Sequence, residues 1–420
     1  MNKLNLNNNE KIKNLAIQAQ NLYKEQKYLD SYSLYKFIFR KFNELRVLPN
    51  LIDIIFISTK KNLIKNRNLK FKLINLLINF GLNKDNGTSL SNELIYLRLK
   101  LLREFKKFEE FQKLFESIDI SLKNVIFVQF EYLHYLLECE KFDEAEIILN
   151  KIKKNKKDFY KNLQFFFIDK NMFELIKNSN FSISHDIVLE VKKNNDNYNY
   201  IVVVSGTYNI FKSEILTFIK SLKKTSKNYL FSLLIHDSTD YQKKDIVKEI
   251  NNIDVDNYLL FFESSQSLSL NSFETKTYYT ARRYLLVNDL MEEFNKPIFL
   301  FDADSIICKN LDIYLNLNKN YDMSLHIKEE LRYFQTSLTA NQSLFLNTKN
   351  SRIFLNFYKK YIYYILKNKK LRWHIDQIVL YVSFIIIKRF YYAKIRNNAE
   401  NNFKNDQSFF YHTFHNKYLL

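Results

Sequence analysis

The stretch PIFLFDADS, residues 297–305, decides the fold of the second half of this 420-residue chain. An apolar run leads into two aspartates, Asp302 and Asp304, which are spaced two residues apart. Because residues i and i+2 of an extended segment face the same side, both carboxylates are expected to project together from the end of a buried strand. Two like charges cost free energy there unless a cation neutralises them, and Mg²⁺ or Mn²⁺ prefers such oxygen ligands. The alternative is a pair of ordinary turn acids.

Two further apolar runs precede this one. They are residues 200–204 (YIVVV) and 229–235 (YLFSLLI), and amphipathic helices are expected over about residues 211–224 and 273–294. Strands that alternate with helices predict a mainly parallel sheet flanked by helices. Ligands bind outside the carboxyl ends of the strands in such sheets. The residues expected at those ends are Ser205, Gly206, Thr207, His236 and Asp237.

The first part of the chain contains an internal repeat. Residues 97–118 and 130–152 each read as a helix, a short charged turn and a second helix. The aromatic residues at the turns, Phe108 and Phe142, are 34 residues apart, and residues 15–42 show the same pattern. These segments resemble tetratricopeptide repeats, which implies an antiparallel helical array with a groove for a protein partner. A helical bundle without a partner of its own is the alternative.

We therefore predict an α + α/β chain with two domains. Residues 1–180 are expected to form the tetratricopeptide-like helical domain, and residues 198–420 a mixed, mainly parallel sheet flanked by helices. Three glycines and two prolines in 420 residues disfavour β-sandwiches and propellers, which need these residues at their corners.

Charge and cysteine content narrow the classes of function. The net charge of +19 is divided almost equally, +9 in residues 1–190 and +10 in residues 191–420, so it does not mark a nucleic-acid site. Two cysteines without zinc spacing indicate a reducing, cytoplasmic compartment. The sequence predicts no export signal and no membrane span; the longest apolar run covers only residues 378–387, which leaves at most peripheral contact with a membrane.

Residues 277–315 (TYYTARRYLLVNDLMEEFNKPIFLFDADSIICKNLDIYL) resemble the donor-binding core of nucleotide-diphospho-sugar transferases of the GT-A fold. They are most similar to the group that contains glycogenin and the bacterial lipopolysaccharide hexosyltransferases. The resemblance implies that Asp302 and Asp304 hold Mn²⁺ or Mg²⁺ on the donor diphosphate, and that Arg282 or Arg283 contacts the donor. It also implies that Ser205, Gly206, Thr207 and Asp237 lie at the strand ends where the family binds the nucleotide.

Two further matches lie downstream. Residues 339–348 (TANQSLFLNT) resemble the acceptor-side strand of the family, and residues 373–377 (WHIDQ) resemble its W-x-x-D-Q helix start. By this resemblance Asp376 is a general base if the reaction inverts the anomeric centre or an orienting carboxylate if it retains it, and Gln377 contacts the donor sugar. In the family a His and a Lys close the site. His412 or His415 would be the third metal ligand here and Lys417 the diphosphate contact, although the family's glycine between them is absent.

The predicted function is transfer of a hexose from a nucleotide-sugar donor, with UDP-sugars favoured, to a polysaccharide, lipid-linked or protein acceptor. A scaffold with an inactive transferase-like domain is the alternative. Nucleotidyl transfer lacks support because the sequence has no Gly-rich phosphate loop, and RNA binding ranks last.

Overall fold

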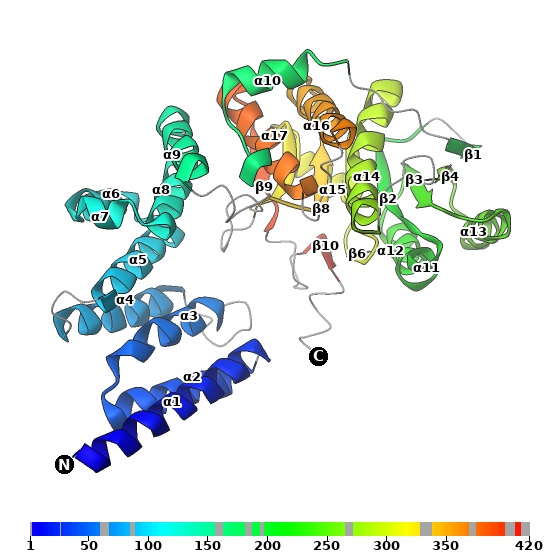
Figure 1. Cartoon of the computed structure of the whole chain (residues 1–420). Coiled ribbons are helices and arrows are strands. Elements are labelled where there is room, and N and C mark those ends of the chain that lie inside the picture. Colours follow the sequence, from blue (N-terminus) through cyan, green and yellow to red (C-terminus); the bar gives the residue numbers. More distant parts are fainter. Residues whose placement is uncertain are drawn as a thin grey trace. The chain divides into compact units, whose positions relative to one another are not determined.

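The computed structural model describes residues 2–25, 27–58, 67–84, 89–155, 163–180, 187–193, 197–264, 272–327, 338–368, 375–399 and 408–412. The chain divides into two compact units, Met1–Ile148 and Leu149–Leu420 (Figure 1). None of the helices in these described ranges combines the length and the hydrophobicity needed to cross a membrane.

The first unit is an array of helices in which each packs mainly on its neighbours in sequence. Phe108 and Phe142 begin helices α6 and α9, as expected from the charged turns before them. Lys106 and Glu140, two residues before each aromatic, both adopt positive φ angles, 56° and 58°. The 34-residue spacing therefore recurs in the backbone, while the assignment to the tetratricopeptide class stays a prediction. The helices are α1 (Asn2–Lys24), α2 (Tyr28–Phe42), η1 (Leu45–Val47), α3 (Leu48–Ser58), α4 (Arg67–Lys84), α5 (Ser89–Glu104), α6 (Phe108–Ser117), α7 (Ile120–Lys123), α8 (Ile126–Glu138) and α9 (Phe142–Asn155).

The second unit is built on a mixed eight-stranded sheet in the order β1-β4-β3-β2-β5-β8-β7-β9. The central strands β4, β3, β2 and β5 run parallel, whereas β1 and β8 are antiparallel to their neighbours. The predicted fold class, a helical array followed by a mixed, mainly parallel sheet flanked by helices, is confirmed. The strands are β1 (Ile187–Lys193), β2 (Tyr200–Thr207), β3 (Tyr229–His236), β4 (Asn257–Glu263), β5 (Ile298–Phe301), β7 (Met323–Ile327), β8 (Leu338–Phe345) and β9 (Ile395–Asn397).

Every residue of β3 and β5 is buried, since helices cover both faces of this sheet. The core on one face joins alternate strand residues such as Val202 and Phe231 to Phe218 and Ile246 of the covering helices. The helices on this side are α11 (Tyr208–Ile210), η4 (Phe211–Ile215), α12 (Leu216–Thr225), α13 (Asp240–Ile253) and α15 (Leu311–Asn318) (Figure 1). Three more helices pack on one another and on strands β2, β5 and β8. They are α14 (Ser272–Phe294), α16 (Lys349–Lys367) and α17 (Ile375–Tyr391).

Residues before the first strand also belong to the packing of this unit. The Tyr361 hydroxyl donates to the Phe165 carbonyl, and Phe173 stacks on Phe390 at 5.4 Å. The elements involved are η3 (Leu163–Phe165) and α10 (Lys170–Lys177), which packs on α16.

The second unit also contains a small two-stranded sheet, whose first strand follows β5 after a short turn. Strand β6 (Ser305–Ile307) pairs antiparallel with β10 (Phe410–His412). Phe410 packs edge-on against Phe301 of β5, 5.2 Å between ring centroids. The segment after Asp304 is therefore joined to a strand that comes about a hundred residues later.

Candidate active site

The carboxyl ends of β2, β3, β4 and β5 lie along one edge of the sheet, because these strands run parallel. Thr207 of β2 pairs with His236 of β3, and His236 pairs with Glu263 of β4. Asp302 follows β5 directly. The predicted residues at the strand ends therefore share this edge.

Gly206 is buried in β2, close to the helix that follows. A Cβ atom at Gly206 would lie 3.0 Å from Cγ2 of Ile210 and 3.1 Å from Cδ1 of Ile215. A side chain here would therefore require Ile210 and Ile215 to shift by a few tenths of an ångström. Ser205 and Thr207, its neighbours, are half-buried.

Asp302 and Asp304 occupy a tight turn between β5 and β6. The strand ends at Phe301, and the amide of Ser305 donates to the carbonyl of Asp302 at 3.1 Å. Both aspartates are half-buried. The alternation argument made from the sequence does not hold, since Ala303 and Asp304 are turn residues and not part of an extended strand. The two aspartates are instead consecutive polar positions of one turn, on either side of Ala303.

Arg283 of α14 fixes this turn. Its guanidinium donates to the Asp302 carboxylate and to the carbonyl of Ala340 in β8, while its Nε donates to the carbonyl of Thr280 at 3.2 Å. Burial alone would lower the pKa of the Arg283 guanidinium, but the adjacent Asp302 carboxylate raises it above its ordinary value. Arg283 therefore stays charged and ties Asp302 to the neighbouring strand.

Arg282, the other candidate, points elsewhere. Its Nε donates to Oε1 of Glu263 at 2.9 Å, and the Tyr278 hydroxyl donates to the same oxygen at 3.0 Å. All three side chains are buried. The sequence left open whether Arg282 or Arg283 contacts the donor; of the two, Arg283 is the one that bonds to Asp302.

A histidine completes the group around Glu263. Nδ1 of His236 lies 3.4 Å from Oε2 of Glu263, and the His236 ring stacks on Tyr279 at 4.1 Å. The Tyr279 hydroxyl donates to the carboxylate of Asp237, an exposed residue with a φ of 51°. Burial lowers the pKa of the His236 imidazole, against the opposing influence of the Glu263 carboxylate. The imidazole is therefore held neutral.

Sequence reasoning missed Glu263. The signal was available, because the strand reads NYLLFFE and its single acid follows an apolar run in the same way as Asp302 does. An acid at the carboxyl end of a parallel strand points to the ligand edge. The acid of β4 here holds a helix in place through Arg282.

Asp376 and Gln377 lie in the first turn of α17, which begins at Ile375. Asp376 is buried, and its charge is one of the influences that raise the pKa of the Arg283 guanidinium, after that of Asp302. Gln377 is half-buried. Trp373 and His374, which begin the predicted motif, lie outside the described residues.

Strand β8 lies in the segment 339–348 that resembles the acceptor-side strand, and it carries buried polar groups. The Asn341 side chain lies against Nδ1 of His326 in β7: its Nδ2 is 2.7 Å and its Oδ1 is 3.0 Å from that nitrogen. The neighbouring Gln342 is fully buried. Within the described part of the chain, its side-chain atoms Nε2 and Oε1 have no hydrogen-bond partner. Ala340, whose carbonyl receives Arg283, precedes them, so this polar strand flanks Asp302.

The predicted third metal ligand is placed only by its backbone. His412 of β10 pairs with Ser305 of β6, next to Asp304 in sequence. His415 and Lys417 lie outside the described residues. Over the ranges that the structure covers, no group of three or more His, Cys, Asp or Glu side chains gathers as a metal centre would. Of the four predicted metal ligands, Asp302 and Asp304 are the two whose side chains the structure describes.

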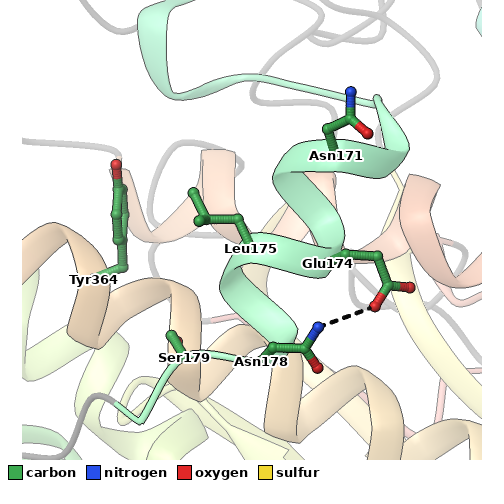
Figure 2. A pocket seen from close by; sticks show the side chains of 6 residues that line it. All are labelled: Asn171, Glu174, Leu175, Asn178, Ser179 and Tyr364. Carbon is green, nitrogen blue, oxygen red and sulfur yellow. Dashed lines mark hydrogen bonds between the residues drawn. The ribbon is translucent and has the colours of Figure 1, made fainter.

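A separate pocket of about 540 Å³ lies between α10 and α16. Figure 2 shows Leu175 of α10 pointing toward Tyr364 of α16, with Glu174 and Asn178 hydrogen-bonded on the adjacent side of α10. None of the predicted site residues lines it; the lining residues are Asn171, Glu174, Leu175, Asn178, Ser179 and Tyr364.

No protein-family model and no curated protein matches the chain. Solved structures do. The glycosyltransferase GlyE of Streptococcus pneumoniae TIGR4 shares 15% identity over 49% of this chain, with a TM-score of 0.34. Mouse xyloside xylosyltransferase 1 shares 10% identity over 51% of this chain, with a TM-score of 0.35. The galactosyltransferase LgtC, crystallised with donor and acceptor sugar analogs, shares 11% identity over 44% of this chain, with a TM-score of 0.32. Each of these is a glycosyltransferase. The match covers 46% of the GlyE chain, 97% of the xylosyltransferase chain and 70% of the LgtC chain.

Proposed function

We propose that this protein is a metal-dependent glycosyltransferase that moves a hexose from a nucleotide-diphosphate sugar to a polysaccharide, lipid-linked or protein acceptor, with UDP-sugars as the favoured donors. The observation that carries the proposal is the turn with Asp302 and Asp304, which follows a buried parallel strand at the ligand-binding edge of the sheet, with Arg283 bonded to Asp302. The resemblance of residues 277–315 to the donor-binding core of GT-A enzymes supports it.

The residues of the turn fit a hard divalent cation, because carboxylate oxygens are the ligands that Mg²⁺ and Mn²⁺ prefer. Asp302 and Asp304 would hold the cation, with His412 or His415 as the third ligand. When bound, the cation offsets negative charge on the leaving nucleoside diphosphate. Lys417 would add a positive charge to the same diphosphate.

The chain's own side chains position the substrates. Ser205, Gly206, Thr207 and Asp237 lie at the ends of β2 and β3 and would contact the nucleotide. Arg283 spans from α14 to Asp302 and Ala340 and holds the turn rigid, as a preorganised site requires. Asp376, buried and coupled to Arg283, would orient the acceptor hydroxyl or accept its proton, and Gln377 would contact the sugar.

The test is donor hydrolysis by the full chain, measured with each of several nucleotide sugars in the presence and absence of Mn²⁺. We expect turnover that requires the cation and that falls at least about a hundredfold in Asp302→Ala. Asp256→Ala is the matched control, because Asp256 is exposed and precedes β4, at the opposite edge of the sheet from Asp302. Metal-dependent turnover that persists in Asp302→Ala would remove the assigned site.

One observation favours the scaffold alternative. The Arg283 guanidinium already pairs with Asp302, so this carboxylate has a counter-charge without a cation. An inactive domain would show no Mn²⁺-dependent heat of binding when it is titrated with nucleotide sugars, and that result would favour the scaffold over the enzyme.

A further inference from the structure

Helix α4 of the first unit is apolar on two opposite faces, and among the described residues its neighbours α3 and α5 pack on the face that carries Ile74 and Ile78. Ile74 and Ile78 are fully buried, and a Cβ atom on Gly81 would lie 2.4 Å from Cδ1 of Leu94 in α5. The other face carries the residues that we call the α4 stripe, namely Leu69, Leu76 and Phe80.

The α4 stripe is most exposed at Leu69 and Leu76, whereas the Phe80 ring at its end packs edge-on against Phe39 of α2, 5.7 Å between ring centroids. The side chains of Leu69, Leu76 and Phe80 are 57%, 63% and 38% exposed, respectively. Spacings of seven and eleven residues place them on one side of a helix. A helix that is apolar on all sides is usually enclosed, so an open apolar face of this kind marks an interaction surface.

The charge along α4 and the segment before it has one sign. From Ile54 to Lys84 the sequence contains no acidic residue and seven basic ones. Lys72 and Lys84, both exposed, lie about 60° to either side of Leu69 at 100° per residue. Lys70 is buried and adds no charge to this surface, because its Nζ donates to the Phe56 carbonyl at 3.1 Å.

This local asymmetry contrasts with the rest of the unit. Residues 101–150 carry eleven acidic and six basic side chains, so the positive charge is concentrated at α4 and before it. Apolar side chains flanked by lysines are the pattern of a helix that lies in the interface of an anionic membrane. Two copies of this chain that met through the stripe would bring like charges together, which disfavours self-association.

We propose that the α4 stripe, flanked by Lys72 and Lys84, docks on the surface of an anionic phospholipid membrane. Leu69, Leu76 and Phe80 enter the boundary between headgroups and acyl chains, and the lysines contact lipid phosphates and carboxylates. This inference uses no residue of the candidate active site, so it stands or falls independently of the proposed transfer activity.

The test is flotation of the full chain with vesicles of phosphatidylcholine alone and of phosphatidylcholine mixed with phosphatidylglycerol, at low and at physiological ionic strength. We expect binding to the anionic vesicles only, weakened by salt. Lys72→Gln should weaken the partition coefficient about fivefold, the effect of one lysine near such a surface, and Leu76→Ser should weaken it at least as much.

The matched controls are Leu29→Ser, in which a leucine of α2 that is 59% exposed is replaced, and Lys113→Gln on the acidic helix α6; both should bind as the wild type does. Since all four positions are exposed or bordering on solvent, their circular dichroism spectra should match. Equal binding to neutral vesicles, equal loss in the controls, or a stripe-dependent dimer in sedimentation velocity without vesicle binding would each overturn the proposal.

Discussion

Arg282 and Arg283 are consecutive residues of α14, yet their guanidinium groups are held at two different strand ends of the sheet. Arg282 donates to Glu263, the last residue of β4, at 2.9 Å, and Arg283 donates to Asp302, directly after β5. Helix α14 is therefore anchored at two points along the carboxyl edge. The first anchor is wholly buried, whereas the second ends at a carboxylate that remains half-exposed.

Arg283→Gln should separate metal binding from turnover. A cation competes with the guanidinium for Asp302, so removal of that positive charge should tighten Mn²⁺ binding by about tenfold or more. Donor turnover should fall, because the turn loses its tie to Ala340. Electron paramagnetic resonance of free Mn²⁺ measures the first quantity and donor hydrolysis the second. Arg352→Gln, a change in α16 at a side chain that bonds to Asn347, is the control. Weaker Mn²⁺ binding in Arg283→Gln would contradict this account.

Glu263→Ala should destabilise the second unit strongly, by about 3–5 kcal/mol, since it leaves the buried Arg282 without its counter-charge. The double variant Glu263→Ala with Arg282→Met should recover much of that loss, because no buried charge remains. Urea unfolding followed by the fluorescence of Trp373, the single tryptophan, reports on this unit. Additive losses in the double variant would show that the ion pair is not the cause.

Stability of the second unit should fall as the pH drops below about 6.5. His236 has a pKa below that ordinary value because it is buried, so the unfolded chain takes up a proton at a pH where the folded chain does not. Protons then favour unfolding, and stability is lost between pH 6.5 and the lower pKa of the folded state. Each histidine of this kind contributes at most about 1.4 kcal/mol per pH unit.

His236→Phe should flatten this dependence when unfolding is followed through Trp373. His134, whose pKa burial also lowers, lies in the first unit, so His134→Phe is the control that should leave the Trp373 transition unchanged. An unchanged slope in His236→Phe would assign the pH dependence to other groups.

The proposed domain boundary can be tested with two fragments. A fragment of residues 198–420 lacks Phe165, Phe166 and Phe173, which are buried within the second unit, whereas a fragment of residues 149–420 keeps them. Each lost aromatic removes about 1.5–3 kcal/mol of apolar burial. We expect the longer fragment to unfold cooperatively and the shorter one to aggregate or to unfold at clearly lower urea. Equal midpoints would support a boundary at residue 198.

His412→Ala and His415→Ala should differ in their effect on the metal. The pairing of His412 with Ser305 places its backbone beside the aspartate turn, so His412→Ala should weaken Mn²⁺ binding by about tenfold, the lower range for loss of a group that supports a metal. Tyr411→Phe, in the same strand, is the control for loss of pairing. A larger effect from His415→Ala would assign the third ligand to that residue.

The parts of this molecule that follow from periodicity were predictable. Apolar runs ended in polar residues at strand ends, and the 34-residue spacing of Phe108 and Phe142 located two helix starts that share a turn geometry. The order of the strands was not predictable, because apolar runs such as those of β2 and β5 carry no information about which partner each one takes.

The site was predictable only where a motif marked it. Asp302 and Asp304 stood out as a pair, but the turn that holds them was predicted to be extended. The residues after Phe301 do not indicate where the strand ends. Adjacent helix positions differ by 100°, so only the packing of α14 decides that Arg283 and not Arg282 reaches Asp302. Glu263 escaped notice because a single acid after an apolar run forms no recognisable pair.

The pairing of β6 with β10 has a consequence for how the protein is made. Ser305 and His412, its partner, are 107 residues apart. At translation rates of about 5–20 residues per second, roughly 5–20 seconds pass between the emergence of the aspartate turn and the synthesis of the strand that covers its flank. During that interval β6 lacks the strand with which it pairs, so its backbone amides and carbonyls on that side stay exposed to solvent until the end of the chain is made.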